Sequence, residues 1–330
     1  SLIISHIFAK YMTNDRYIVL KIFVLASFIN SIIVYINIIM PSSRILIQSI
    51  MPVAGNLPPD YFFRTGGLSN GPGASLSIFH SLGSVVAYFL LSKSKNIKRK
   101  FLFSFLTLFI LGSTLFISRT GFFLFFMIIG FYSIFFNILK IKLLFVNIIY
   151  LLLSSILSGV FLYFVLNIIL DSNQIYLFQE RFIPWAFELF ISYFNSGEIS
   201  SASTNDLIDN HFFLPDNVSS LFFGEAYYLG IGGNGHYIPS DSGYVRSIFS
   251  IGIIGSIIAY SFFPIVLFIV YKYFLDKSIY KLLVTIIIML LVVEIKMPFM
   301  YVGKVNLILY IVIFSEIQYF YKQKRLLNAL

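Results

Sequence analysis

The sequence contains no cysteine, a single tryptophan and few charged residues. Without cysteine the chain forms no disulfide and uses no thiolate as nucleophile or metal ligand, while the redox state of its compartment stays open. Only 11% of the residues are charged and 58% are hydrophobic, a balance that excludes a soluble globular domain. The composition therefore predicts an all-α fold, a polytopic transmembrane helix bundle.

Acidic residues are scarcer than basic ones, 14 against 23, which leaves a formal net charge of +9. Such an excess is typical of nucleic-acid binding, but here most of the cations lie in short segments between apolar runs. The positive-inside rule assigns such segments to the cytoplasm, where they also attract anionic lipids. We therefore expect membrane lipids, and no nucleic acid, as partners of these cations.

Eight apolar runs reach or approach the roughly 20 residues that a helix needs to cross a bilayer. They are 17–40, 75–92, 101–118, 120–138, 143–170, 245–271, 279–293 and 301–320. We expect one integral-membrane domain over 1–330, with an extracytoplasmic loop at 171–244 between spans five and six. The chain begins at Ser1 without a methionine or a cleavable signal-peptide pattern, which leaves open whether further helices precede it.

The densest group of basic residues lies at 93–100 and predicts that this loop is cytoplasmic. Alternation then places both chain ends inside, and places 41–74, the turn at 119, 171–244 and 294–304 outside. A few cations remain on the outer side, against the rule: Arg44, Arg64, Arg119, Arg181, Arg246, Lys296 and Lys304. These cations are candidates for a binding site.

Arg119 interrupts an apolar stretch from Phe101 to Asn137. One helix of that length would be about 55 Å long, far thicker than a bilayer. The chain must therefore reverse, and residues 118–121 are the expected place. Two interpretations of Arg119 stay open, a snorkelling anchor at the interface and a site arginine held at the outer rim.

The outer loop at 64–73 is rich in glycine and proline, which opposes helix and strand and favours a tight turn with inward-pointing N–H groups. His80 follows in the outer half of the next span. It either hydrogen-bonds neighbouring helices or touches a substrate.

The loop at 171–244 is too long for a simple connection and is expected to carry function or short helices. Residues 180–193, which include Trp185, have apolar side chains at helical spacing and predict an amphipathic helix on the outer leaflet. Residues 200–220 are polar and suggest an irregular excursion. Glycines at 230, 232 and 235 match a dinucleotide-binding spacing, but no βαβ pattern surrounds them, and we discard that reading.

Residues 240–255 carry Asp241 and Arg246 at the mouth of the sixth span. Charges at such a position are interface anchors, a mutual salt bridge or site residues. Gly252 and Gly255 are expected to let this helix pack closely against a neighbour.

Glu294 and Lys296 lie at the end of the seventh span, followed by Pro298. Two residues apart, they do not stack on one helix face. The alternatives are an ion pair across the outer rim and a lysine that faces an anionic substrate.

The predicted outer face thus combines cations, glycine-rich turns and a few acids. It shows no metal-ligand cluster at a recognisable spacing and no serine–histidine–aspartate order, so we expect no metal and no cofactor. Arginine forks match phosphate oxygens, and a leaving pyrophosphate gains charge as its bond breaks. A membrane-tethered lipid pyrophosphate is therefore the ligand class that fits best, and a nearby carboxylate would orient or deprotonate an acceptor hydroxyl.

These residues resemble the Wzy-type O-antigen and capsular polysaccharide polymerases and, more distantly, the O-antigen ligases. The resemblance spans about residues 60–305 and depends on four short motifs. They are Arg64 with its glycine-rich loop, Ser118-Arg119-Thr-Gly121, Asp241-Ser-Gly-Tyr-Val-Arg246 leading to Gly252 and Gly255, and Glu294-x-Lys296-x-Pro298. The ligases carry a histidine three residues before the tyrosine of a similar segment, where this chain has Asp241 before Tyr244. That departure favours a polymerase.

The resemblance implies a metal-independent, inverting glycosyltransferase of the GT-C kind in the bacterial inner membrane, with its site facing the periplasm. Its partners would be undecaprenyl-pyrophosphate-linked oligosaccharides as donor and acceptor, and a chain-length regulator. Arg119 and Arg246, with Arg64 and Lys296, would hold the pyrophosphate, while Asp241 or, less well placed, His236 would contact the attacking hydroxyl. The implied substrate-binding set is completed by Tyr244, Arg181 and Glu294.

Two alternatives remain. An O-antigen ligase would use the same donor with a lipid A core as acceptor, and its loss would leave no glycan on the core. A lipid-linked oligosaccharide flippase or other transporter predicts charges spread through the bundle and internal repeats, whereas the charges of this sequence gather at one rim.

Overall fold

The computed structural model describes most of the chain outside the predicted fifth span. The described residues are 2–12, 15–50, 64–69, 73–136, 149, 175–176, 178–197, 201–229, 237–299 and 305–328. Over these residues the secondary structure is helical, without a strand, as the composition predicts. The fifth span at 143–170, apart from residue 149, and the glycines at 230–235 lie outside the described residues.

Four helices are long and apolar enough to cross a membrane: Ile18–Ile39, Ala74–Lys93, Ile97–Ile117 and Gly243–Tyr273. They coincide with four of the predicted spans, which supports a membrane protein. The described parts of the predicted spans at 120–138, 279–293 and 301–320 lie in helices α6 (Arg119–Phe136), α14 (Lys277–Val293) and α15 (Val305–Asn328), which do not belong to that group of four. The total of eight spans and their orientation stay predictions.

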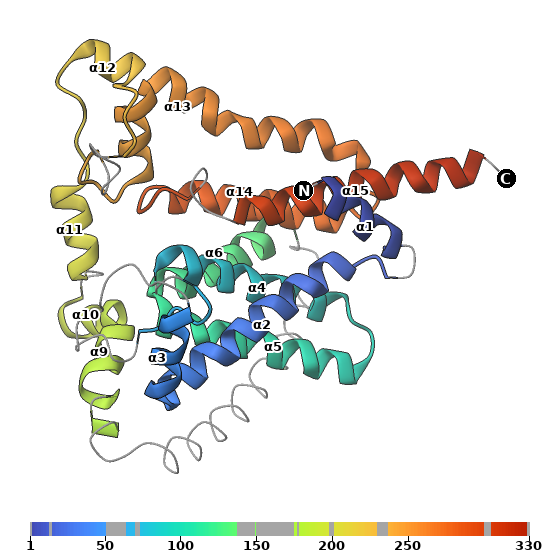
Figure 1. Ribbon diagram of the computed structural model, residues 1–330, viewed down its shortest axis with the longest axis horizontal. Helices are drawn as coiled ribbons and strands as arrows, with labels where there is room; N and C mark the ends of the chain where they lie inside the picture. The colour runs from blue at the N-terminus through green and yellow to red at the C-terminus, as the bar shows by residue number, and fades with distance from the viewer. Residues whose placement is uncertain are drawn as a thin grey trace. The chain divides into compact units, whose positions relative to one another are not determined.

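The chain divides into two compact units, residues 14–187 and residues 1–13 with 188–330. Each unit is described by itself. The elements of both are drawn in Figure 1.

The unit at 14–187 is built around α4 (Ala74–Lys93), which packs against α2 (Ile18–Ile39), α5 (Ile97–Ile117) and α6. Small residues let these helices approach closely, as is usual between membrane helices. A Cβ atom added at Gly83 would lie 2.2 Å from Ser27 Oγ, and one at Gly121 would lie 2.2 Å from the carbonyl oxygen of Ser77.

The reversal predicted at 118–121 is confirmed. Helix α5 ends at Ile117, Ser118 is extended (φ −168°, ψ 139°), and α6 begins at Arg119. The unit also contains α3 (Pro41–Ile50), the π-helix η3 (Phe178–Phe182) and α9 (Ile183–Ala186). A buried cluster joins the ends of α2 and α5 to η3 and α9: Val34, Ile38, Phe116, Ile117, Phe182 and Ala186.

The single amphipathic helix predicted at 180–193 is wrong. The segment is helical, but η3 and α9 end in a turn at Phe187, and α10 (Glu188–Ser196) begins in the other unit. Phe182 and Ala186 are buried in the first unit, a long-range contact that apolar spacing alone does not reveal.

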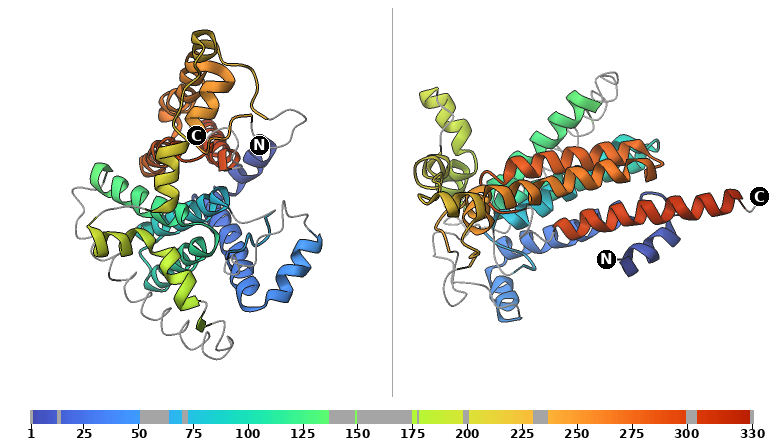
Figure 2. Two further views of the ribbon diagram at one scale, coloured as in Figure 1. Left: turned by 90° about the vertical axis from the view of Figure 1, so that its left-hand side faces the viewer. Right: turned by 90° about the horizontal axis from the view of Figure 1, so that it is seen from above.

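The unit formed by 1–13 and 188–330 contains the helices α1 (Leu2–Tyr11), α10, α11 (Ala202–Asn210), α12 (Val218–Phe223), α13 (Gly243–Val270), η5 (Tyr271–Tyr273), α14 and α15. Within it α14 packs against α13 and α1 packs against α15, and Figure 2 shows α13 beside α14. The irregular excursion predicted at 200–220 is wrong, because it contains α11 and the start of α12. Each of these short helices has a side-chain N-cap, Ser201 for α11 and Asn217 for α12.

Helix α13 is broken at Gly252, whose φ of 70° and ψ of 174° are not helical. The expected close packing of this glycine is present, since a Cβ atom there would lie 2.1 Å from the carbonyl oxygen of Phe222. The sequence indicated the close approach and missed the break.

Candidate functional site

The first candidate site is the Trp185 cluster, formed by Arg64, Arg119 and Trp185 in the unit at 14–187. The Arg119 Nη1 donates to the carbonyl oxygen of Trp185 at 2.9 Å. The guanidinium carbon of Arg119 lies 5.0 Å from the centre of the Trp185 ring, and that of Arg64 lies 5.6 Å from it. Both distances are in the range of cation–π attraction.

The position of Arg64 follows from the loop that carries it. The Thr65 N–H donates to the carbonyl of Phe116 at 3.0 Å, and Arg64 Nη2 donates to the carbonyl of Ile117 at 3.5 Å. The loop therefore uses carbonyls at the last turn of α5, which lack partners inside their own helix. Both arginines therefore lie at the C-terminal end of α5. Arg64 reaches it from the loop at 64–69, and Arg119 follows directly after the reversal at Ser118.

Polar side chains of α2 form hydrogen bonds with the loop at 64–69. Asn30 Oδ1 accepts from the Leu68 N–H at 2.8 Å, and Asn37 Nδ2 donates to Thr65 Oγ1 at 3.1 Å. Gly67 has φ +56°, and a Cβ atom there would lie 2.5 Å from Asn30 Oδ1, so this position requires glycine.

His80 belongs to the same polar layer and not to an open site. Its Nε2 contacts Asn30 Nδ2 at 2.8 Å and its Nδ1 contacts Ser113 Oγ at 2.7 Å and Ser31 Oγ at 3.1 Å. The side chain is fully buried. The interpretation of His80 as a helix-to-helix hydrogen-bonding residue is the one that these contacts match.

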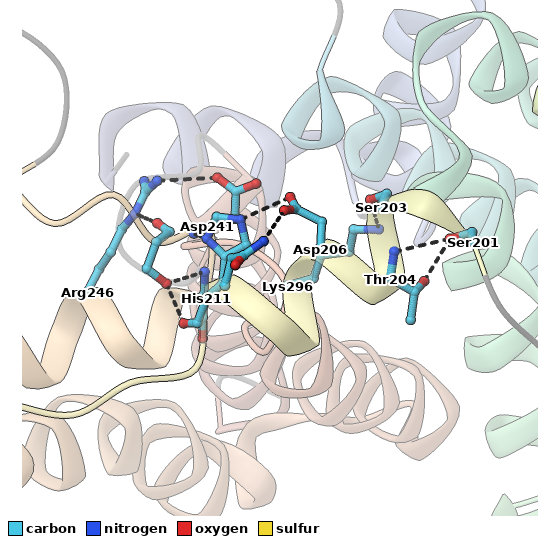
Figure 3. Close-up of polar contacts among 11 residues, drawn as sticks. Ser201, Ser203, Thr204, Asp206, His211, Asp241, Arg246 and Lys296 are labelled. Atoms are coloured by element: carbon cyan, nitrogen blue, oxygen red, sulfur yellow. Dashed lines mark hydrogen bonds and ion pairs between the residues drawn. The ribbon is translucent and has the colours of Figure 1, made fainter.

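The second candidate site is the Arg246 cluster, formed by Arg246, Asp241, Ser240, His211 and Asp206 in the other unit (Figure 3). Arg246 Nη2 lies 3.6 Å from Asp241 Oδ1, and Arg246 Nε donates to the carbonyl of Ser240. The Arg246 side chain is 10% exposed and the Asp241 side chain is 68% exposed. The salt bridge that the sequence left open is thus present, between a largely covered cation and an exposed carboxylate.

Local geometry explains this arrangement. Ser242 is the N-cap of α13 and its hydroxyl accepts from the Val245 N–H at 3.5 Å. Residue 246 therefore lies in the first turn of the helix, where its side chain reaches back to the residues that precede the cap.

His211 connects Asp241 to α11. The Asp241 N–H donates to His211 Nδ1 at 2.9 Å, so the ring proton lies on Nε2, which is 3.3 Å from Asp206 Oδ2. Hydrogen bonds from the Asn210 amide and from His211 lower the pKa of the Asp206 carboxyl. His211 also accepts at its carbonyl from Ser240 Oγ at 2.8 Å. The backbone around Asp241 is therefore held at two points.

Glu294 and Tyr244 join α13 to the end of α14. The Glu294 side chain is 1% exposed, and its carboxylate accepts from Tyr260 Oη at 2.8 Å and from the Phe299 N–H at 2.8 Å. Tyr244 Oη donates to the carbonyl of Leu291 at 2.7 Å. These contacts give both residues a packing role, and their substrate-binding role stays a prediction.

Lys296 lies near α11, where its Nζ donates to Ser203 Oγ at 3.0 Å. Arg181 is exposed on η3, in the unit of the Trp185 cluster. His236 and Lys304 lie outside the described residues.

The structure therefore brings together two subsets of the predicted residues. Arg64 and Arg119 share one ring, and Asp241 and Arg246 form an ion pair. The convergence of all the predicted residues on one site stays a prediction.

Sequence reasoning missed Trp185, Asp206 and His211 as members of these clusters. Trp185 was available as the only tryptophan of the chain, a residue type that attracts arginine. The spacing of Asp206, Asn210 and His211 on one helix end was the signal for the second cluster. In the described part of the chain, no group of three or more His, Cys, Asp or Glu side chains could hold a metal ion.

Comparisons with protein-family models, with curated proteins and with solved structures find no match for this chain.

Proposed function

We propose that this chain is a polysaccharide polymerase of the bacterial plasma membrane, as its resemblance to the Wzy-type enzymes implies. In this proposal eight spans cross the membrane, both chain ends are cytoplasmic and the site faces the periplasm. The enzyme transfers a glycan from undecaprenyl pyrophosphate to the non-reducing end of a second lipid-linked repeat unit.

The Trp185 cluster is the observation that carries the proposal. Two arginines from the predicted outer segments meet on one indole ring, at 5.0 and 5.6 Å. Their contacts with the ring and with the carbonyls of Trp185 and Ile117 orient the guanidinium groups. A pair of oriented guanidinium groups suits phosphate oxygens, which accept two parallel N–H bonds from one fork.

In the proposed reaction the acceptor hydroxyl oxygen attacks the anomeric carbon of the donor sugar. The bond from that carbon to the pyrophosphate oxygen breaks, and its electron pair leaves with undecaprenyl pyrophosphate. Arg64 and Arg119 stabilise the charge that develops on the leaving group, which is the largest effect available to a site of this kind.

The resemblance assigns Asp241 the role of taking the proton of the attacking hydroxyl or orienting it. Its exposed carboxylate and its anchored backbone suit that role, and Arg246 acts as a positioning residue through the ion pair at 3.6 Å. An aspartate here, where the ligases carry a histidine, supports a polymerase over a ligase. Lys296, Tyr244, Glu294 and Arg181 are assigned to substrate binding only by the resemblance.

The test replaces Arg119 or Arg64 by alanine in cells that depend on this chain for polymer. We expect loss of long-chain polymer, read as a ladder on a polysaccharide gel, while immunoblots show normal insertion. Arg99→Ala is the matched control, because Arg99 is exposed on the predicted cytoplasmic side, at the start of α5.

The gel also separates the alternatives. A polymerase that fails leaves a single repeat unit on the core, a ligase that fails leaves a bare core, and a transporter that fails leaves the repeat units on the inner face. Unaltered ladders in both Arg119→Ala and Arg64→Ala would refute the site assignment.

A further inference from the structure

Helix α12 (Val218–Phe223) presents large apolar side chains to its surroundings. Phe223 is 71% exposed and Val218 is 67% exposed, and Leu214 just before the helix is exposed as well. Exposed apolar surface of this kind marks contact with a protein or a membrane. The polar helix α11 (Ala202–Asn210), a few residues earlier, has no comparable concentration of aromatic residues.

Helix α12 is fastened to α13 at the break of that helix. The N–H groups of Glu225 and Ala226 donate to the carbonyls of Phe249 and Ser250 at 2.8 and 2.9 Å. Both carbonyls lie next to the break of α13, where Gly252 has φ +70°. The end of α12 is therefore fixed at the level of Gly252.

The break divides α13 into a polar and an apolar part. Tyr244, Arg246, Ser247 and Ser250 precede Gly252, whereas the residues that follow it to the end of the helix are almost all apolar. The stretch from 252 to 271 has about 20 residues and a length of about 30 Å, which is the thickness of the hydrocarbon core. A span over 252–271 places one boundary of the hydrocarbon core at the level of Gly252.

The exposed face of α13 continues onto α12. Ile254 and Ile258 are exposed along the apolar part, and Ile251 is exposed at the break. A Cβ atom at the buried Gly252 would lie 2.5 Å from the amide nitrogen of Phe223, and one at Gly224 would lie 2.5 Å from that of Ile251, so the end of α12 lies against the backbone of the break. The exposed side chains of Phe223 and Ile251 therefore come from adjacent backbone segments, where α12 meets the candidate span.

We propose that α12 is a membrane-surface helix whose Phe223 and Val218 side chains contact the acyl chains of the bilayer at the hydrocarbon boundary. Continuity with the lipid-facing side of a candidate span identifies the partner as the bilayer, as for other interfacial helices. The hydrogen bonds from Glu225 and Ala226 then hold the polar part of α13, with Arg246, at the level of the headgroups. This inference is independent of the proposed polymerase activity.

The absence of cysteine from the whole chain makes single-cysteine labelling a direct test. Phe223→Cys, Ile258→Cys and Asp209→Cys would each carry an environment-sensitive fluorophore in phosphatidylcholine–phosphatidylglycerol vesicles. Lipids with a spin label near the headgroup or deep in the acyl chain, and aqueous iodide, serve as quenchers. Ile258 is the control for the span, and Asp209, exposed on α11, is the control for water.

We expect the Phe223 label to be quenched at least twofold more by shallow than by deep spin labels, and little by iodide. The Ile258 label should show the reverse depth preference, and the Asp209 label should respond to iodide alone. Val218→Cys repeats the comparison if Phe223→Cys does not retain the helical content and Trp185 fluorescence of the parent chain.

Two results would overturn the inference. Quenching of the Phe223 and Val218 labels by iodide alone would place α12 in water. A label that leaves water only when polyprenyl phosphate is added to the vesicles would identify the surface as a binding site for that lipid and not for the bilayer.

Discussion

The Trp185 cluster and the Arg246 cluster both use arginine on the predicted outer side, but they surround the charge differently. Arg119 donates to a carbonyl oxygen and lies over an indole ring. Arg246 contacts the Asp241 carboxylate, which balances it. The comparison teaches that the two arginines differ in their neighbours, an aromatic ring in one cluster and a carboxylate in the other, and the proposed function gives them different roles on that basis.

Asp241→Asn tests the exposed carboxylate of the Arg246 cluster and should have the largest effect on activity. The amide keeps the shape but loses the charge and the basicity, so we expect polymer formed per unit time to fall by roughly 10²-fold, the scale of a general base. The measurement is an in vitro polymerisation assay with purified lipid-linked repeat units.

The same variant separates catalysis from stability. Because the Asp241 carboxylate is 68% exposed, solvent weakens its ion pair with Arg246 to about 0–1 kcal/mol, so the unfolding midpoint in detergent should change little. Asp209→Asn, which alters another exposed carboxylate of the same unit, is the control and should leave activity unchanged. A large loss of stability with unchanged activity in Asp241→Asn would make the pair a structural anchor.

Gly67→Ala tests the support of the Trp185 cluster. The positive φ and the approach of Asn30 Oδ1 to 2.5 Å from the added Cβ atom predict a destabilisation of about 2 kcal/mol. Trp185 fluorescence during thermal unfolding in detergent reports on this unit directly. Gly73→Ala is the matched control, since no atom lies within 4 Å of the Cβ atom added there, and equal midpoints for the two variants would contradict the buried loop.

Trp185→Leu tests the ring itself. Loss of the cation–π contacts should cost about 1 kcal/mol of binding free energy, roughly a fivefold weaker affinity for a lipid pyrophosphate. Trp185→Phe keeps an aromatic face and should lose less. Equal affinities of the two variants, measured by titration calorimetry, would show that the ring only fills space.

Lowering the pH tests the contact between His211 and Asp206, with the smallest expected effect. Because the folded-state pKa of Asp206 is lowered by Asn210 and His211, its stabilising contribution is present above the unfolded pKa. That contribution is lost as the pH falls below about 4 and through the lowered value. Asp206→Asn should remove this part of the loss of stability at acid pH. If the unfolding midpoint falls with pH equally in the variant and the parent chain, the contact contributes nothing in solution.

Much of the helical framework was predictable because it depends on local properties. Long apolar runs indicate the helices now seen at Ile18–Ile39, Ala74–Lys93 and Ile97–Ile117. The reversal at Ser118 follows from the length of the run around Arg119, which no bilayer accommodates in one helix. The turn into α13 follows from Ser242 and Gly243.

The candidate sites were only partly predictable because their contacts are long-range. The sequence by itself determined that the chain is an apolar helical protein, and it predicted arginines on the side where the positive-inside rule disfavours them. Only the tertiary structure decided that Arg64 and Arg119 share Trp185, 121 and 66 residues away along the chain (185 − 64 and 185 − 119). It also decided that His211 holds the backbone of Asp241 and that α13 breaks at Gly252. Periodicity records which face of a segment is apolar, whereas the partner of a side chain depends on how distant helices pack.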